Sequence, residues 1–186
     1  MQSFENGKII NMDFPKLNTP RLKLIEINES HLDDLFEIFS DEETMKFYDI
    51  WPHQDKEKTL LHNQSYQKRY ADGAGIRWGI SLDSKLIGTI AFVWHPKRHI
   101  ANFGYDLNKI YWGKGLMTEA IESVLKYAFE VQKIHRVEAQ TDLQNIASQR
   151  VLLKNGFVRE GELRDKMFFR DRYNTVVSFS KLITDK

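Results

Sequence analysis

Two glycines and a lysine stand where an expected strand gives way to the strongest helical pattern of the chain. Gly113 and Gly115 flank Lys114, and the amphipathic pattern begins at Leu116. Amides in the first turn of a helix have no intrahelical partner, and together with the helix dipole they favour an anion. Glycine lets a phosphate approach the backbone closely, and Lys114 adds a positive charge. The segment indicates a pyrophosphate-binding turn, although two glycines that only ease a tight strand-to-helix turn would give the same pattern.

Two well-known phosphate motifs do not fit this segment. The dinucleotide-binding pattern G-x-G-x-x-G needs a third glycine, and Thr118 stands at that position. The P-loop pattern G-x-x-x-x-G-K-[ST] needs a glycine five positions before Gly113, where the chain has Asn108, and Ser or Thr at Gly115. The local pattern therefore predicts a phosphate contact without identifying its ligand.

Composition excludes several classes of protein. The chain has 186 residues, which fits one domain able to bury its own core. Its 27 Lys and Arg against 26 Asp and Glu give a net charge of +1, which argues against a general nucleic-acid binder. The absence of cysteine excludes a disulfide framework, a zinc-thiolate site and a cysteine nucleophile. Neither a signal-peptide pattern nor a membrane-length apolar run is present, so we expect a cytoplasmic protein without a membrane segment.

The elements that must position the glycine turn follow from the periodicity of apolar residues. The pattern predicts helices over 28–39, 42–48, 55–70, 116–131 and 145–154. It predicts strands over 21–27, 77–82, 85–94, 100–107, 136–141, 157–169 and 173–183. This order is typical of an α+β domain with one mixed sheet. We expect residues 1–13 to be an N-terminal lead-in and residues 14–186 to form the domain.

The series of motifs resembles the GNAT superfamily of N-acetyltransferases, and more closely its RimJ/RimL-like branch. The resemblance runs from about residue 14 to residue 182. Its motifs stand in this order: the opening strand TPRLKL at 19–24, the acyl-CoA motif GYDL at 104–107 with YWGKGLMTEA at 111–120, RVEA at 136–139, NIAS at 145–148, KNGF at 154–157 and EG at 160–161. Each motif is weak alone, and their order and spacing together carry the resemblance.

The resemblance implies a single-domain GNAT-like fold, with a mixed, mostly antiparallel twisted sheet of about seven strands flanked by helices. A splayed pair of strands would hold acetyl-CoA, the cosubstrate, and no metal is implied. The pantetheine would pair with the backbone of Tyr105, Asp106, Leu107 and Asn108. The pyrophosphate would contact the turn made by Trp112, Gly113, Lys114, Gly115, Leu116, Met117 and Thr118. Against the superfamily pattern Q/R-x-x-G-x-G/A, Trp112 replaces Gln or Arg and Met117 replaces the last small residue, as is common in the RimJ/RimL-like branch.

The next helix supplies three further candidates. By resemblance, Asn145 would bond the pantetheine amides, and Ser148 shares its helix face at i+3. Lys154 would neutralise the 3′-phosphate of CoA, and the alternative is a solvated surface charge. We expect the acceptor to be a primary amine, either a protein N-terminus or a small molecule.

The absence of cysteine bears on mechanism, because it leaves direct transfer from acetyl-CoA to the amine as the simplest route. A lysine amine has a pKa of about 10.4 and an α-amine about 7.7 to 8.0, so the enzyme needs a proton acceptor and an acid for the thiolate. Backbone N–H at the end of the strand over 103–107 would receive the developing oxyanion.

Related ribosomal-protein acetylases place Glu and Tyr where this chain has Gln140 and Leu152. Glu138, two residues earlier on the same strand face, is the substitute base, and its alternative is a strand Glu that pairs with a neighbouring Arg or faces solvent. Ser148 is the candidate donor to the thiolate, and its alternative is a serine that bonds backbone or contacts CoA without catalytic effect. Ordered water and backbone carbonyls form a third alternative for the base.

Two rival functions remain at this point. The missing Glu and Tyr motivate a catalytically inactive CoA-binding regulatory module of the same fold. A ribosome-associated or nucleic-acid-binding protein is the second rival, which the near-neutral charge disfavours. His95 and His99 flank Pro96 without a third ligand, so we expect a loop surface and no metal site. The oligomeric state is left open between monomer and homodimer.

Overall fold

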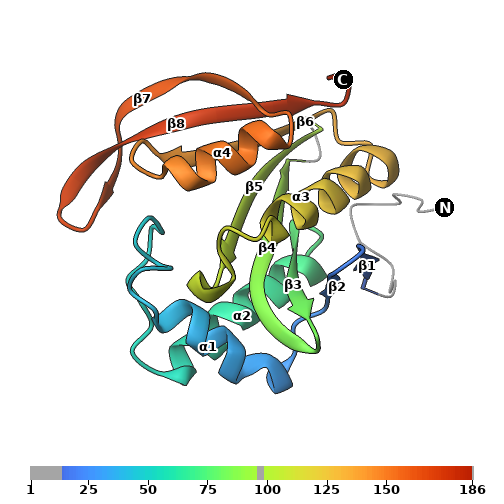
Figure 1. Cartoon of the computed structure of the whole chain (residues 1–186), viewed down its shortest axis with the longest axis vertical. Helices are drawn as coiled ribbons and strands as arrows, with labels where there is room; N and C mark the ends of the chain where they lie inside the picture. Colours follow the sequence, from blue (N-terminus) through green and yellow to red (C-terminus); the bar gives the residue numbers. More distant parts are fainter. Residues whose placement is uncertain (1–13, 96–98, 186) are drawn as a thin grey trace.

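An open, twisted sheet runs through the protein in the order β1-β2-β3-β4-β5-β6-β8-β7 (Figure 1). The computed structural model describes residues 14–95 and 99–185, so the predicted lead-in of residues 1–13 lies outside the described part. The strands are β1 (Leu17–Asn18), β2 (Lys23–Ile25), β3 (Gly75–Leu82), β4 (Lys85–His95), β5 (Ile100–Leu107), β6 (Arg136–Asp142), β7 (Val158–Phe169) and β8 (Arg172–Leu182).

The predicted mixed, mostly antiparallel sheet is confirmed. All neighbouring strands are antiparallel except β5 and β6, which are parallel. The described residues form eight strands rather than about seven, because the short β1 adds two pairs to β2. Asp83 and Ser84 form the turn that closes the β3–β4 hairpin, with φ of +49° and +68°.

Four α-helices flank the sheet. They are α1 (Leu32–Ser40), preceded by a 3₁₀ turn at Glu29–His31, α2 (Lys56–Ala71), α3 (Leu116–Lys126), continued by a π-helical turn at Tyr127–Val131, and α4 (Ile146–Lys154). A further 3₁₀ turn, Lys109–Tyr111, connects β5 to the glycine turn. Side chains cap the N-termini of α2 and α4: Asp55 accepts from the amide of Lys58, and Asn145 accepts from the amide of Ser148.

The helix predicted over 42–48 is wrong. The segment forms consecutive turns, because its backbone hydrogen bonds mix i−4 and i−3 partners: the amide of Met45 donates to the carbonyl of Asp41, and the amide of Tyr48 donates to the carbonyl of Met45. The Asp41 side chain also takes the amide of Thr44 at 2.8 Å. Met45 is buried while Phe47 and Tyr48 face a pocket, so tertiary contacts and not helical periodicity place these apolar side chains.

The two faces of the sheet carry separate cores, since successive strand residues point to opposite sides. Ile76, Trp78 and Ile80 of β3 pack in the larger core, together with the buried stripe of α3. Leu86, on the opposite face, packs with Leu35, Ile38 and Phe39 of α1. Figure 1 shows α1 and α2 side by side in the lower half of the view, with α4 and most of α3 above them. The glycine turn therefore opens on the α3 face.

A histidine pair lies between α1 and α2, with His53 buried and His62 partly exposed. His62 packs against Phe39 at 5.0 Å and against His53 at 5.3 Å between ring centroids. His53 Nδ1 bonds the hydroxyl of Thr59 at 2.8 Å, whereas His62 Nδ1 is buried without a hydrogen-bond partner in the described structure. Burial, aided by the positive charge of Arg77, lowers the pKa of His62 to about 3.

Mild acid should therefore destabilise the protein. Between pH 6.5 and 3 the unfolded chain binds a proton at His62 that the folded chain excludes, so the free energy of unfolding falls as the pH is lowered through this window. We expect a loss of about 1 kcal/mol per pH unit, below the one-proton limit because the ring is partly exposed. Urea denaturation at pH 7 and pH 5 measures it. His62→Gln should reduce the slope, the exposed His135→Gln is the matched control, and an unchanged slope in His62→Gln would contradict the assignment.

Candidate active site

Strands β5 and β6 separate part-way along their length. Their parallel pairing runs from Ile100 opposite Arg136 to Phe103 opposite Ala139 and stops there. Strand β5 continues to Leu107, while β6 remains paired with β8 as far as Asp142. The β5 edge over 104–107 thus faces a gap instead of a ladder partner. The splayed pair expected from the resemblance is confirmed.

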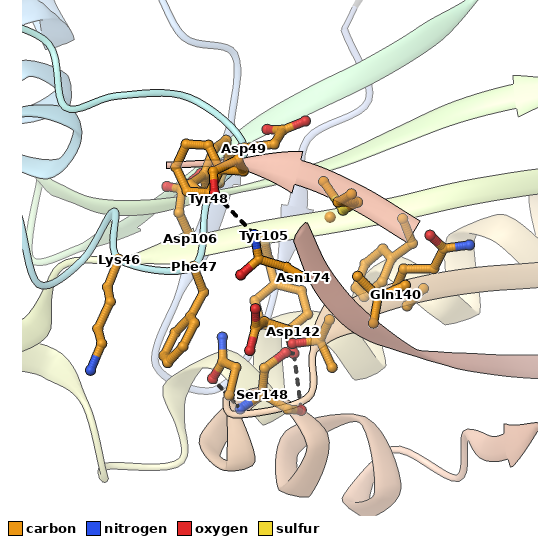
Figure 2. A pocket seen from close by; sticks show the side chains of 18 of the residues that line it. Lys46, Phe47, Tyr48, Asp49, Tyr105, Asp106, Gln140, Asp142, Ser148 and Asn174 are labelled. Carbon is orange, nitrogen blue, oxygen red and sulfur yellow. Dashed lines mark hydrogen bonds between the residues drawn. The ribbon is translucent and has the colours of Figure 1, made fainter. Parts of the chain in front are cut away.

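A cavity of about 480 Å³ opens at this gap (Figure 2). Its walls come from β5, β6, the N-terminus of α4, the β7–β8 hairpin and the turns over 44–49. Tyr48 and Asp49 from those turns face Asn174 from the hairpin, and Tyr105 and Ser148 close the other side (Figure 2). The segment expected to be helical therefore supplies one wall of the pocket, which sequence periodicity did not indicate.

The glycine turn has the geometry of an anion site. Gly113 and Gly115 both have φ of +74°, a region that L-residues with side chains rarely adopt. A Cβ on Gly113 would meet nothing within 4 Å, and one on Gly115 would meet only the guanidinium of Arg21 at 3.7 Å. Gly115 is the N-terminal cap of α3, so the first-turn amides of this helix are approachable from the surface.

Arg21 joins this turn through contacts that the sequence did not reveal. Its Nη1 donates to the carbonyl of Lys114 at 3.0 Å, and its Nε donates to Glu119 at 2.6 Å. Glu119 also accepts from the hydroxyl of Thr19 at 2.5 Å. Arg21 lies more than ninety residues before the turn in the chain, and only the fold places its charge beside the helix N-terminus.

The remaining residues of the predicted turn over 112–118 differ in what their side chains contact. Leu116 and Met117 bury their side chains in the core, which leaves their amides as the groups for a ligand. Lys114 Nζ lies 5.3 Å from the centroid of the Tyr111 ring. Trp112 Nε1 donates to the carbonyl of Leu107 at 2.6 Å, so this indole closes the turn onto the end of β5.

The four residues predicted for pantetheine have different surroundings. Tyr105 and Leu107 lie on the β5 edge that faces the gap, while the Asp106 side chain points into a buried network. Asn108 donates its amide to the carbonyl of Ile87 at 2.8 Å, and its side chain bonds Ile110 and Glu37. The amide of Asn108 is therefore already engaged, and its role is to hold the strand end.

A buried ion pair lies directly beneath the pocket. Arg77 Nη2 stands 2.9 Å from Asp106 Oδ2, and both side chains are almost completely buried. Thr89 donates to both Asp106 oxygens, and Tyr48 contacts Arg77 at 2.9 Å. The Arg77 guanidinium also lies 4.0 Å from the centroid of the Tyr66 ring. Burial raises the pKa of Tyr48 above its ordinary value, so this phenol stays protonated and contributes a neutral hydrogen-bonding group.

Ser148 and Asn145 meet at the N-terminus of α4. The Asn145 side-chain oxygen accepts from the Ser148 amide at 3.1 Å, so it serves as the helix cap. Ser148 Oγ lies 2.8 Å from the hydroxyl of Tyr105 on β5. Both Asn145 and Ser148 line the pocket. Lys154 is exposed at the opposite end of α4 and does not line it.

Glu138 lines the pocket but is not free. Its carboxylate accepts from Arg136 Nε at 2.7 Å, and Arg136 also contacts Glu160 at 2.6 Å. The alternative stated for Glu138, pairing with a neighbouring arginine, is what the structure contains. Gln140 is exposed into the same pocket and Leu152 is 1% exposed in the core, so neither restores a titrating group.

Two further carboxylates line the pocket, and no sequence motif predicted them. Asp142 stands at the end of β6 and accepts from the amide of Gln144 at 2.7 Å, and Asp49 projects from the opposite wall (Figure 2). Within the described part of the chain, neither takes part in an ion pair. No local motif marks these positions, because Asp49 reaches the pocket from the turns over 44–49 and Asp142 from the end of β6, which are far apart in the chain.

Among the described residues, no group of three or more His, Cys, Asp or Glu side chains could hold a metal ion. Among the described helices none is long and apolar enough to span a membrane.

Known proteins match this chain over most of its length. The sequence pattern of the acetyltransferase (GNAT) domain matches residues 21–158. The Bacillus subtilis protein named uncharacterized N-acetyltransferase YoaA is 36% identical over 158 residues, which cover 83% of this chain and 89% of that protein. The ribosomal-protein-serine acetyltransferase of Escherichia coli is 26% identical, with 87% and 93% covered.

Solved structures agree with the fold. The RimL ribosomal L7/L12 α-N-protein acetyltransferase, determined in complex with coenzyme A, superposes with a TM-score of 0.84 at 21% identity and covers 90% of this chain and 98% of its own. These relatives are consistent with the RimJ/RimL-like branch. The domain match over 21–158, the relative at 36% identity and the splayed β5–β6 pair agree: the chain is an acyltransferase that belongs to the GNAT acetyltransferase family.

Proposed function

We propose that the protein transfers an acetyl group from acetyl-CoA directly to a primary amine, either the N-terminus of a protein or a small molecule. The observation that carries the proposal is the unpaired edge of β5, which opens into the cavity close to Ser148. Relatives named ribosomal-protein-serine acetyltransferase and putative ribosomal N-acetyltransferase support a protein acceptor, and a relative named spermidine N(1)-acetyltransferase, 26% identical, supports a small amine.

We match the parts of CoA to the glycine turn and to the unpaired edge of β5. We assign the pyrophosphate to the turn from Trp112 to Thr118, where two positive-φ glycines expose the α3 amides and Lys114 adds charge. Pantetheine would extend along the β5 edge of Tyr105 and Leu107, whose backbone groups lack a partner strand on that side. Lys154 remains a candidate for the 3′-phosphate.

Acetyl transfer to an amine then requires three groups in the pocket: donors for the oxyanion, a donor for the thiolate and an acceptor for the amine proton. Backbone N–H groups near the end of β5 would receive the developing carbonyl oxyanion. Ser148 would donate a hydrogen bond to the departing thiolate, and its place at the N-terminus of α4 also favours negative charge there. Because Arg136 engages Glu138, we favour proton removal from the amine by water in the pocket over direct abstraction by Glu138. Asp49 and Asp142 would attract the cationic form of the amine.

An acceptor screen tests the proposal. Free thiol is measured as it is released from acetyl-CoA in the presence of N-terminal peptides, ribosomal proteins, polyamines and small primary amines. Acetylated product, identified by mass, is expected from at least one class. Tight CoA binding without turnover on any acceptor would favour the inactive CoA-binding module. Salt-sensitive RNA binding without CoA binding would favour the nucleic-acid rival.

Ser148→Ala should lower kcat more than it changes KM for acetyl-CoA. A hydrogen bond to a charged group contributes about 1.5 to 3 kcal/mol, so we expect kcat to fall roughly 10- to 150-fold, with KM within about threefold. Steady-state kinetics with the best acceptor measures both constants. Ser148→Thr, which keeps the hydroxyl, is the matched control. A raised KM with unchanged kcat would make Ser148 a binding residue only.

A further inference from the structure

Tyr105 reaches from β5 to α4 and contacts the candidate catalytic serine. Its hydroxyl lies 2.8 Å from Ser148 Oγ and 3.3 Å from the Ser148 carbonyl oxygen (Figure 2). The ring packs against Phe103 at 5.4 Å between centroids, which fixes its direction from the strand. The hydroxyl therefore meets Ser148 from the sheet side of the helix.

The Tyr105 phenol keeps its proton under the conditions of catalysis. Burial raises the pKa of Tyr105 to about 12, and only the hydrogen bond with Ser148 opposes that effect. At neutral pH the group is a neutral donor with one proton. Leu152, one turn further along α4, is buried and brings no hydroxyl, so Tyr105 is the phenol that this pocket presents to Ser148.

Either hydroxyl can donate in the contact between Tyr105 and Ser148, and the neighbouring acceptors favour Tyr105 as the donor. A hydroxyl has one proton to donate and two lone pairs that accept. The carbonyl of Ser148 lies inside α4, where the helix ladder already supplies an amide donor, and it is the more distant of the two acceptors of Tyr105. When Tyr105 donates to Ser148 Oγ, the Ser148 hydroxyl does not donate to Tyr105. Its proton then points toward the pocket.

We propose that Tyr105 is a positioning residue that directs the Ser148 hydroxyl proton at the sulfur leaving acetyl-CoA. This inference rests on the proposed function. In that step the C–S bond breaks and its electron pair stays on sulfur, while the amine nitrogen forms the new bond to the acetyl carbon. Ser148 donates a hydrogen bond to sulfur, and Tyr105 donates one to Ser148. The proton that sulfur finally takes comes from the amine through water.

Two measurements on Tyr105→Phe test this role. The first titrates the thiol of bound CoA in the binary complex, by thiolate absorbance against pH, and needs no acceptor. Loss of the Tyr105 donor should weaken the Ser148 bond to the thiolate and raise the thiol pKa by about half to one unit. The second is kcat, which we expect to fall about 5- to 10-fold with KM for acetyl-CoA nearly unchanged.

Two controls separate positioning from a general effect on structure. Tyr173→Phe removes a hydroxyl from an exposed residue of the hairpin and should leave both measurements at the wild-type value. In a Ser148→Ala background, Tyr105→Phe should have almost no further effect on kcat, because the proton it directs is gone.

Several results would overturn the inference. These are an unchanged thiol titration and kcat in Tyr105→Phe, equal losses of kcat with and without Ser148, or a loss of CoA affinity without a shift of the thiol titration. If the wild type acetylates no amine but Tyr105→Phe still shifts the thiol titration, the positioning role holds and the proposed transfer to an amine fails.

Discussion

Gly115→Val is expected to weaken CoA binding by two to three orders of magnitude. Gly115 has φ of +74°, so a β-branched residue is strained there, and its side chain would occupy the open space over the α3 amides. Losing the contact of a doubly charged pyrophosphate with these amides corresponds to about 2.7 to 4 kcal/mol, or roughly 100- to 1,000-fold in Kd. Isothermal titration calorimetry with CoA measures the change.

A variant with similar backbone strain elsewhere distinguishes loss of the phosphate site from a general effect of strain. Gly73, in the turn between α2 and β3, has φ of +68°, so Gly73→Val introduces similar strain away from the glycine turn. It should lower the melting temperature and leave the Kd for CoA unchanged. S-acetylpantetheine, which lacks the pyrophosphate, should be used equally well by Gly115→Val and the wild type. A wild-type Kd for CoA in Gly115→Val would contradict the phosphate assignment.

Asp106→Ala is expected to produce the largest loss of stability. It leaves the Arg77 guanidinium buried beside Tyr66 and Tyr48 without a counter-charge. Removal of one partner from a buried ion pair typically lowers the free energy of unfolding by about 3 to 5 kcal/mol. Equilibrium urea unfolding measures this loss.

The double variant Arg77→Met with Asp106→Leu provides the critical comparison. Replacing both charges by apolar side chains of similar volume removes the unpaired charge, so we expect at least half of the lost stability to return. Asp72→Ala breaks the exposed pair of Lys68 and Asp72, whose side chains are 76% and 56% exposed, and should cost at most about 0.5 kcal/mol. A loss below about 1 kcal/mol in Asp106→Ala would show that Arg77 is solvated from the pocket.

The ion pair of Arg77 and Asp106 stabilises the fold and also positions two walls of the pocket. Arg77 holds the Tyr48 hydroxyl, and Tyr48 belongs to the turns that form one wall of the cavity. Asp106 is the neighbour of Tyr105 on β5, so the ion pair also fixes the strand that carries the serine partner. The double variant should therefore fold well while its KM for the amine rises, which acceptor kinetics would detect.

Strand and helix positions were largely predictable, because burial on one face leaves a periodic record in the sequence. Strand β5 has its predicted bounds, and α3 begins at the predicted Leu116. The segment over 42–48 was not predictable in this way. Its apolar residues serve a pocket wall and a small core, so their spacing reflects neighbours from distant strands rather than a helical face.

Some features of the candidate site were predictable from the sequence, and others depended on tertiary contacts. The amino-acid sequence by itself determined the glycine turn, the helix that it opens and the family, because these depend on local backbone geometry and on motifs in a fixed order. Tertiary structure alone decided that Arg136 engages Glu138, that Arg21 lies beside the glycine turn, and that Tyr105 holds Ser148. Each of these is a contact between residues on different strands, turns or helices, or a choice among several polar neighbours. Side-chain directions and strand register set such contacts, and residue spacing along the chain does not decide among the possible partners.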